Sequence, residues 1–392
     1  MRKLFTLLLF SSLYFANTHA QSSSGFVGNG YYRVHNLATG RYIYVTDNKD
    51  YYNEKRDEED FQAIQLWKDP EKAVSDPASI IYIVQLGSTR YDLQAQGTGV
   101  RELTGYTVNV EKKGEAYEVS ASRGSVTKYL SDDRSNDNPR GVIGTSNKLN
   151  YRRWVVDKIE TDHSTNYFGI KPTISLNGKY YQPFFADFAF KLSSPNMHVY
   201  YVSNVAGNIA KFQELEGEIP ANTPVVIECV SPNPTDNRLE ILKRDTEPLP
   251  GNKLVGVYFC NGERPDESVD AYTDFNAATM RLLTVSEGKL VLTDNAPDRL
   301  NTITHFDWDL YEDVEHICIP ANTCYLKAEA GTPSELNIRF VGVGIDEILA
   351  ENKKANAEGV FTLSGTQLRA NNDVNGLPAG LYIVGGVKVA IK

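Results

Sequence analysis

Three side chains that can bind a metal alternate in the segment HFDWDLYEDVEH, residues 305–316. His305, Asp307 and Asp309 occupy every second position, so a β-strand would place them on one face. Carboxylates in this arrangement favour Ca²⁺ or Mg²⁺, and a second histidine, His316, would favour Zn²⁺. An edge strand that is charged against aggregation has the same pattern without a metal. The segment therefore gives a metal-site hypothesis and a structural alternative.

A second group of candidate residues lies in a highly charged segment. Ten of the fifteen residues from 47 to 61 are charged, and Tyr51 and Tyr52 lie among them. Tyrosine rings suit the apolar face of a sugar, and Asp47 and Asn48 could form hydrogen bonds beside them. These four residues are our candidate ligand-binding residues. The alternative is a solvated loop, because runs of charged residues usually face solvent.

All four cysteines lie in the second half of the chain. An even number permits disulfides in an exported protein, with three connectivities. Cys318 and Cys324 bracket a short turn, so we expect them to pair, which leaves Cys229 for Cys260. No two cysteines have the C-x-x-C spacing of a zinc or redox site.

Signatures of catalysis are absent from the sequence. It has no G-x-S-x-G, no H-E-x-x-H and no Cys/His pairing of a thiol protease. We therefore expect a protein that is not an enzyme and needs no cofactor. Paired carboxylates for glycoside hydrolysis form in space rather than in sequence, so a glycan-active enzyme stays open as an alternative.

Length and charge narrow the class of protein. A chain of 392 residues is too long for one hydrophobic core, which predicts two or more domains. Its 40 basic and 50 acidic residues give a net charge of −10, which argues against nucleic acids or anionic membranes as partners. Charged residues at 23% and hydrophobic residues at 41% exclude a disordered chain.

The N-terminus has the pattern of a signal peptide. Arg2 and Lys3 precede the apolar run 4–15, and Thr18-His19-Ala20 supplies small residues at a cleavage site. The apolar run is too short to span a membrane. We expect residues 1–20 to be removed after Ala20 and the protein to be secreted or on the cell surface. Cleavage leaves 38 basic and 50 acidic residues, a net charge of −12.

Residues 25–160 read as an all-β domain with three similar units. The units start at residues 31, 80 and 117, and each has two strand-like runs separated by a short polar turn. The runs Tyr31-Tyr32-Arg33-Val34 and Gly40-Arg41-Tyr42-Ile43, with Gln65-Leu66-Trp67 after them, resemble the ricin-type β-trefoil lectins. The third unit has Arg152-Arg153-Trp154 in place of Q-x-W, and the second has no tryptophan. The resemblance implies a glycan or host glycoprotein as partner, and core positions for both tryptophans.

Residues 167–345 contain many short strand-like runs and predict a β-sandwich-like domain, after a polar linker at 160–166. Glu287-Gly288 is a hairpin turn signal. The sequence IPANT occurs at 219–223 and again at 319–323, each time before a strand-like run. This repeat favours a duplicated structural turn with its asparagine in a left-handed or Asx conformation. The surrounding segment resembles secreted proteins of Bacteroidetes.

The C-terminal residues form a third region. Residues 346–358 read as a linker, and residues 359–392 as a small β tail in which Gly376-Leu377-Pro378-Ala379-Gly380-Leu381-Tyr382-Ile383-Val384 precedes a basic final strand. This tail resembles the sorting domains of type IX secretion in Bacteroidetes, which implies the secretion machinery as a partner. The alternative is a hairpin that completes the preceding domain.

Together these features predict an all-β, exported binding protein. It would combine a β-trefoil-like domain, a β-sandwich-like domain and a small β tail. A carbohydrate or glycoprotein is the expected ligand of the first domain. A structural or adhesive surface component with no small-molecule site is the alternative from another class, and a glycan-active enzyme is the third.

Overall fold

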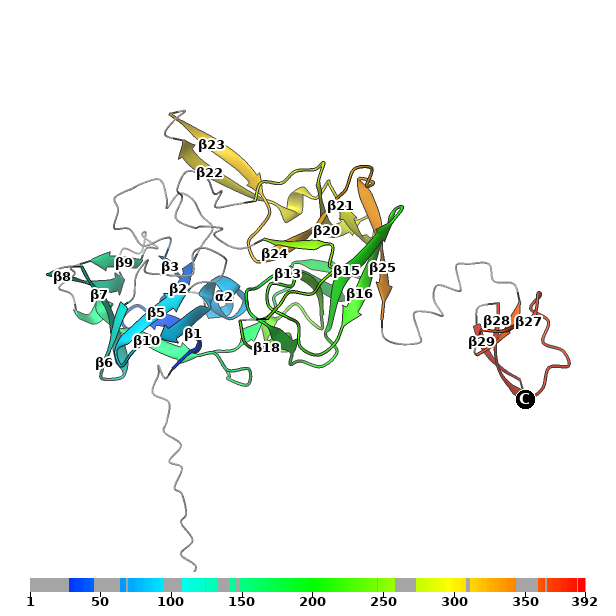
Figure 1. Ribbon diagram of the computed structural model, residues 1–392, viewed down its shortest axis with the longest axis horizontal. Helices are drawn as coiled ribbons and strands as arrows, with labels where there is room; N and C mark the ends of the chain where they lie inside the picture. The colour runs from blue at the N-terminus through cyan, green and yellow to red at the C-terminus, as the bar shows by residue number, and fades with distance from the viewer. Residues whose placement is uncertain are drawn as a thin grey trace, which may run out of the picture.

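The computed structural model confirms the all-β fold class (Figure 1). It describes residues 28–45, 64–67, 70–94, 108–123, 125–132, 141–144, 149–244, 246–257, 273–307, 311–342, 359–363, 365–385 and 387–391. Within these ranges the helices are short: α2 (Pro70–Ser75) and the 3₁₀ helices η1 (Pro77–Ser79), η2 (Leu149–Arg152), η3 (Pro234–Asp236) and η4 (Pro297–Arg299). None of the described helices is long and apolar enough to cross a membrane.

The N-terminal part forms one sheet of ten strands. They are β1 (Gly30–Asn36), β2 (Tyr42–Val45), β3 (Ile64–Trp67), β4 (Ile81–Gln85), β5 (Arg90–Gln94), β6 (Val108–Lys113), β7 (Ala116–Arg123), β8 (Val126–Asp132), β9 (Gly141–Gly144) and β10 (Trp154–Lys158). The sheet curls so that its first and last strands pair, from Tyr32 opposite Lys158 to Asn36 opposite Trp154. Strand β10 also pairs with β7, between Trp154 and Tyr117.

The three predicted strand–turn–strand units are present as β1–β2, β4–β5 and β7–β8. Their trefoil arrangement stays a prediction. The sheet encloses an apolar core that includes Tyr32, Ile81 and Trp154. Trp154 is fully buried, as expected, and its ring N–H donates to the carbonyl of Leu130 at 3.0 Å. Trp67 lies in β3 and pairs through its backbone with Tyr42 of β2, but its side chain is not among those described.

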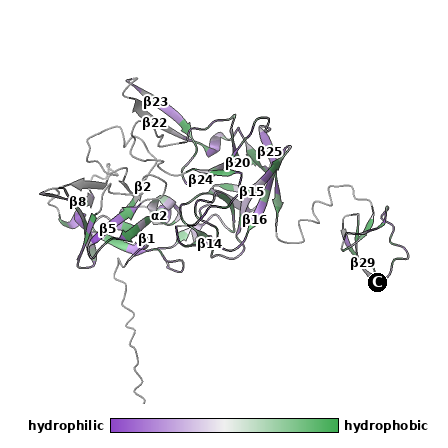
Figure 2. Cartoon of the chain, viewed as in Figure 1, coloured by the Kyte–Doolittle hydropathy of each residue, from purple (hydrophilic) through white to green (hydrophobic). Residues whose placement is uncertain are grey.

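The central part is built on a second sheet of ten strands. They are β12 (Ile174–Leu176), β13 (Lys179–Phe184), β15 (His198–Ala206), β16 (Ile209–Leu215), β17 (Val225–Cys229), β19 (Leu254–Val257), β20 (Met280–Ser286), β21 (Lys289–Thr293), β24 (Thr323–Lys327) and β25 (Glu335–Val341). Their order is β12-β13-β17-β15-β16-β25-β21-β20-β24-β19. Hydrophobic and hydrophilic residues mix along these strands (Figure 2), because one face of the sheet packs on the core while the other is more exposed to solvent. The Glu287-Gly288 hairpin turn is confirmed, with φ of 48° and 72°.

This sheet contains an internal duplication. Repeat 1 (β13, β15, β16, β17) has the spatial order β13-β17-β15-β16, and repeat 2 (β19, β20, β21, β24) has the order β19-β24-β20-β21. The chain visits the four strands in the same sequence in both repeats. The pairing registers also agree: Phe184 pairs with Val225 in repeat 1, and Val255 pairs with Tyr325 in repeat 2. Strand β25 lies between the two repeats, parallel to β16 and antiparallel to β21.

The IPANT turns occupy equivalent places in the two repeats. Each turn leads into the last strand of its repeat in the sequence, β17 or β24, which is the second strand in the spatial order. Asn222 and Asn322 both have positive φ, 58° and 54°. The left-handed conformation expected for these asparagines is therefore confirmed, and the turn is structural in both copies.

Smaller sheets complete the fold. One contains β11 (Phe168–Gly169), β18 (Arg238–Ile241) and β14 (Phe190–Leu192). A hairpin of β22 (Asn301–Asp307) and β23 (Glu312–Cys318) projects from repeat 2 (Figure 1). The tail contains β26 (Val360–Thr362), β27 (Gln367–Arg369), β28 (Gly380–Val384) and β29 (Val387–Ile391). Among the described strands these four pair only with one another.

The segment expected as a linker, residues 160–166, is held in place by hydrogen bonds. The Arg238 guanidinium donates to the carbonyls of Thr161 and His163, at 2.8 and 3.1 Å. The ring nitrogen Nδ1 of His163 accepts the backbone N–H of Asn166 at 2.8 Å. The bonds from Arg238 attach the segment to β18 of the central part.

Candidate functional site

The four residues expected to bind a ligand, Asp47, Asn48, Tyr51 and Tyr52, lie outside the described residues. The structure does place the two ends of their segment. Strands β2 and β3 form an antiparallel hairpin whose last described pair is Val45 with Ile64. The candidate residues therefore belong to the connection of one hairpin, and β3 is an edge strand of the N-terminal sheet.

The metal hypothesis for the β22–β23 hairpin stays untested. His305 and Asp307 lie on β22, with their backbones opposite Val314 and Glu312, while Asp309 is outside the described residues. The side chains of His305 and Asp307 are not among those described. Within the described part of the chain no group of three His, Cys, Asp or Glu side chains could hold a metal. His316 pairs instead with Asp274, at 3.1 Å between Nδ1 and Oδ1.

The expected Cys318–Cys324 disulfide is not formed in the structure, where both residues are buried thiols. Cys229 is a buried free thiol, and its expected partner Cys260 lies outside the described residues. The reason is that β23 and β24 belong to different sheets, so the turn between Cys318 and Cys324 does not fold them together. The Cys324 thiol instead donates to the carbonyl of Val225 at 3.3 Å. Burial raises the pKa of Cys229 and of Cys324 to about 12, so both stay protonated at neutral pH.

A buried carboxylate joins the first and third units of the N-terminal sheet. Asp132, at the end of β8, accepts two hydrogen bonds from the Arg41 guanidinium and one from the Thr39 hydroxyl. Thr39 belongs to the turn between β1 and β2, which Gly40 makes tight with φ of 70°. The Asp132 side chain is fully covered, so the ion pair fixes the turn and leaves this carboxylate closed to a ligand.

A buried arginine joins the N-terminal sheet to the start of the central part. The Arg33 guanidinium donates from Nε to the carbonyl of Ala73 at 2.8 Å and to the Ser79 hydroxyl at 3.0 Å. Its Nη1 donates to Asn166 Oδ1 at 2.8 Å and to the carbonyl of Tyr167 at 2.6 Å. Burial lowers the pKa of Arg33 to about 9, so it remains charged at neutral pH. These bonds tie β1 and α2 to the chain that enters the central part.

Aromatic and ionic contacts extend the same junction. The ring of Tyr31 lies 5.6 Å from that of Phe188, measured between centroids. Arg244, from the central part, donates to Gln94 Oε1 at 2.7 Å, forms an ion pair with Asp187 and stacks over the ring of Tyr82. The junction therefore has a packed core rather than a loose hinge.

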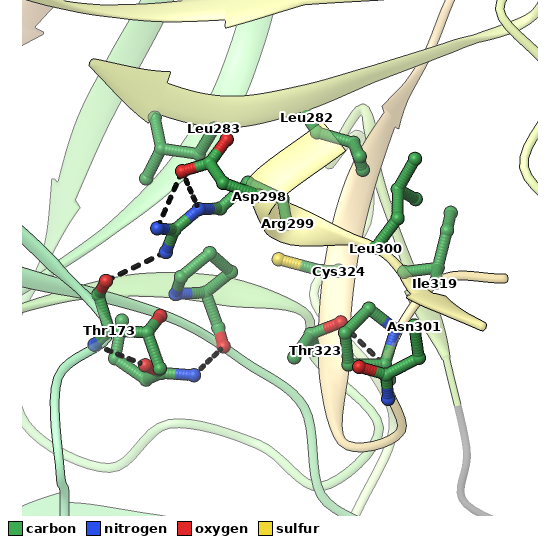
Figure 3. Close-up of a pocket in the computed structure, with 13 residues that line it drawn as sticks. Thr173, Leu282, Leu283, Asp298, Arg299, Leu300, Asn301, Ile319, Thr323 and Cys324 are labelled. Carbon is green, nitrogen blue, oxygen red and sulfur yellow. Dashed lines mark hydrogen bonds and ion pairs between the residues drawn. The ribbon is translucent and has the colours of Figure 1, made fainter. Parts of the chain in front are cut away.

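A pocket of about 280 Å³ opens on repeat 2, where β13 of repeat 1 supplies part of its wall (Figure 3). Its walls come from both ends of the central sheet, from η4 and from the second IPANT turn, and its lining residues are Thr173, Gln182, Pro183, Leu282, Leu283, Asp298, Arg299, Leu300, Asn301, Ile319, Pro320, Thr323 and Cys324. Leucine, isoleucine and proline side chains supply an apolar interior. Such a volume is at the small end for ligand sites, so only a small group or a short segment could fill it.

Hydrogen bonds hold the rim of this pocket. The Arg299 guanidinium binds Asp298 Oδ2 through Nε and Nη2 and donates from Nη1 to the carbonyl of Thr173 at 2.7 Å. The Thr323 hydroxyl donates to the carbonyl of Pro320 at 2.6 Å, which leaves its oxygen lone pairs available as acceptors. The arrangement can accept N–H donors beside an apolar group. It has no nucleophile with an activating base.

Comparisons with known proteins give no family. No family model matches the chain, and no curated protein matches it. Three solved structures are similar at low level. A lectin of Polyporus squamosus, bound to a human-type influenza-binding epitope, is 12% identical with a TM-score of 0.25 over 34% of this chain and 51% of its own. Cry35Ab1 is 15% identical with a TM-score of 0.24 over 47% and 58%.

The third structure, a mosquitocidal holotoxin, is 11% identical with a TM-score of 0.26 over 78% of this chain and 35% of its own. The chain thus spans about half the length of the lectin and somewhat more of Cry35Ab1. TM-scores this low support no argument about the arrangement or the activity of this chain. The function must therefore be argued from the chain's own residues.

Proposed function

We propose that this chain is an exported, non-enzymatic binding protein that recognises a glycan, free or on a glycoprotein, through its N-terminal β unit. The observation that carries this proposal is the pairing of Val45 with Ile64, which makes residues 46–63 the connection of one hairpin. Two tyrosines, an aspartate and an asparagine on one such connection supply a ring face and hydrogen-bonding groups for a sugar. Loops carried on a rigid β scaffold are a common place for binding residues.

The alternatives differ in what a glycan array would detect. The full chain, labelled and applied to immobilised glycans, should bind a defined subset of them. A chain that binds none would be a structural or adhesive component instead. Bound glycan that is released with a shortened structure would identify a glycan-active enzyme. Intact glycan in the eluate supports a binding function.

Export is the second part of the proposal, and the tail supports it. Strands β26, β27, β28 and β29 form their own sheet, with buried Val360 and Tyr382 as its small core. We propose that residues 359–392 direct the protein to its final location. Deletion of residues 359–392 should leave a folded protein that accumulates in the periplasm. A degraded or insoluble truncated chain would mean that the tail belongs to the central fold.

A further inference from the structure

The two repeats allow each pocket-lining residue to be compared with its counterpart. Val226 pairs with Tyr200 in repeat 1, and Leu326 pairs with Arg281 in repeat 2. Two residues further along each strand, Val202 therefore corresponds to Leu283. The IPANT turns likewise align Thr223 with Thr323, and Pro224 with Cys324. Leu283, Thr323 and Cys324 all line the pocket.

In repeat 1 the same three positions bind a segment of the chain itself. The backbone N–H of Leu249 donates to the Thr223 hydroxyl at 3.1 Å. The Asn252 side chain donates to the carbonyl of Pro224 at 2.7 Å. The backbone N–H of Lys253 donates to the carbonyl of Val202 at 2.8 Å. Residues 249–253 thus fill, in repeat 1, the place that is a pocket in repeat 2.

The sequence repeats this segment at the spacing of the IPANT turns. Residues 246–253 are TEPLPGNK, and residues 346–353, one hundred positions later, are DEILAENK. The shared letters are E, L, N and K, and they include the three residues that make the contacts in repeat 1. The turn itself differs, because Glu351 replaces Gly251, whose φ is 79°.

We propose that the pocket in repeat 2 is a peptide-binding site and that its occupant is the segment 346–353 of this chain. Strand β25 ends at Val341, and the described residues continue to Gly342. The proposed occupant begins four residues later and lies outside the described residues. Leu349 would donate its N–H to the Thr323 hydroxyl, and the Asn352 amide would bind beside Cys324. Leu282, Leu300 and Ile319 give the apolar wall that a leucine side chain needs. Such binding would anchor the start of the tail to the central sheet.

The test uses the full chain and a labelled synthetic peptide with the sequence of residues 346–353. In the variant Leu349→Asp/Asn352→Asp the internal segment can no longer compete. The peptide should bind this variant saturably and at least tenfold more tightly than it binds the wild type. Adding Thr323→Val, which removes the hydroxyl acceptor but keeps the shape, should weaken peptide binding about three- to tenfold.

The matched control is Thr223→Val, because that hydroxyl already serves Leu249 in repeat 1. It should leave peptide binding to the Leu349→Asp/Asn352→Asp variant unchanged. Circular dichroism verifies that each variant is folded. A peptide that binds neither protein would overturn the proposal. Equal binding to wild type and variant would show a site open to a partner's peptide, and would also overturn it. Glycan binding by the N-terminal unit is a separate measurement and does not depend on this result.

Discussion

Asn222 and Asn322 hold the same left-handed backbone and make the same hydrogen bond in the two repeats. The backbone N–H of Asn222 donates to the carbonyl of Ala186 at 2.9 Å, and that of Asn322 donates to the carbonyl of Val257 at 2.8 Å. The Asn322 side chain also donates to the carbonyl of Phe185 at 3.1 Å. The two copies therefore share the same backbone conformation and the same backbone hydrogen bond.

Substitutions of Asn322 should separate the contribution of its conformation from that of its side-chain hydrogen bond. Asn322→Ala should lower the free energy of unfolding by about 2 kcal/mol, because alanine is strained at positive φ and the buried bond to Phe185 is lost. Asn322→Gly should cost only about 1 kcal/mol, because glycine adopts this conformation freely and only the hydrogen bond is lost. Urea unfolding measures both. Equal costs for the two variants would contradict a role for the left-handed conformation.

Trp154 should be the most sensitive single position of the N-terminal sheet. It is fully buried where β10 meets β1 and β7, so Trp154→Ala should cost about 3–5 kcal/mol and lower the melting temperature. The same change at Trp67 carries the same expectation from the sequence. An unchanged melting temperature for Trp67→Ala would show that the trefoil register is wrong.

Arg33 should stabilise the junction between the N-terminal sheet and the start of the central part through geometry as well as charge. Arg33→Lys keeps the charge but cannot donate to Ala73, Ser79, Asn166 and Tyr167 at once. We expect a loss of about 2–3 kcal/mol, because buried acceptors lose their partners. Chemical denaturation tests this, with the exposed Arg90→Lys as control. Similar stability of the two variants would mean that the four hydrogen bonds of the Arg33 guanidinium do not stabilise the fold.

His35 should make the fold less stable in mild acid. Burial lowers its pKa below the ordinary value of 6.5, against the weaker opposing effect of Asp157. The unfolded chain then binds a proton that the folded chain does not, so stability falls as the pH drops below about 6.5. The melting temperature of His35→Gln should decline less than that of the wild type over this range. Parallel declines would place the acid sensitivity elsewhere.

The cysteines should behave as buried thiols. With a pKa of about 12 caused by burial, Cys229 and Cys324 should resist a thiol reagent at about pH 8 in the native protein and react once urea unfolds it. Mass mapping without reductant identifies any bridge. A Cys318–Cys324 linked peptide would contradict the structure and restore the pairing expected from sequence.

Local patterns in the sequence were sufficient for the turns and many strands. The three strand–turn–strand units, the Glu287-Gly288 hairpin and the conformation of Asn322 all follow from residues close together in the chain. Contacts between distant residues were not accessible in this way. Nothing near Arg33 in the sequence indicates that it meets Asn166, and no spacing shows that Leu283 faces Thr323 across a pocket.

The repeat explains why Cys318 and Cys324 do not pair in the structure. Cys318 and Cys324 are close in sequence, and that proximity suggested a disulfide. The IPANT turn between them starts a strand of the central sheet, whereas Cys318 ends the separate β22–β23 hairpin. Recognition that residues 219–223 already form such a turn before β17 would have argued against the pair.

Titration of a glycan into paired variants tests the central claim most directly. A glycan bound on the array is titrated calorimetrically into the wild type, into Tyr51→Ala/Tyr52→Ala and into Tyr311→Ala, which removes a tyrosine that is 77% exposed on the other part of the molecule. We expect the double variant to bind at least tenfold more weakly and Tyr311→Ala to bind like the wild type. Unchanged affinity in the double variant, or no glycan bound by the wild type, would contradict glycan recognition through the β2–β3 connection.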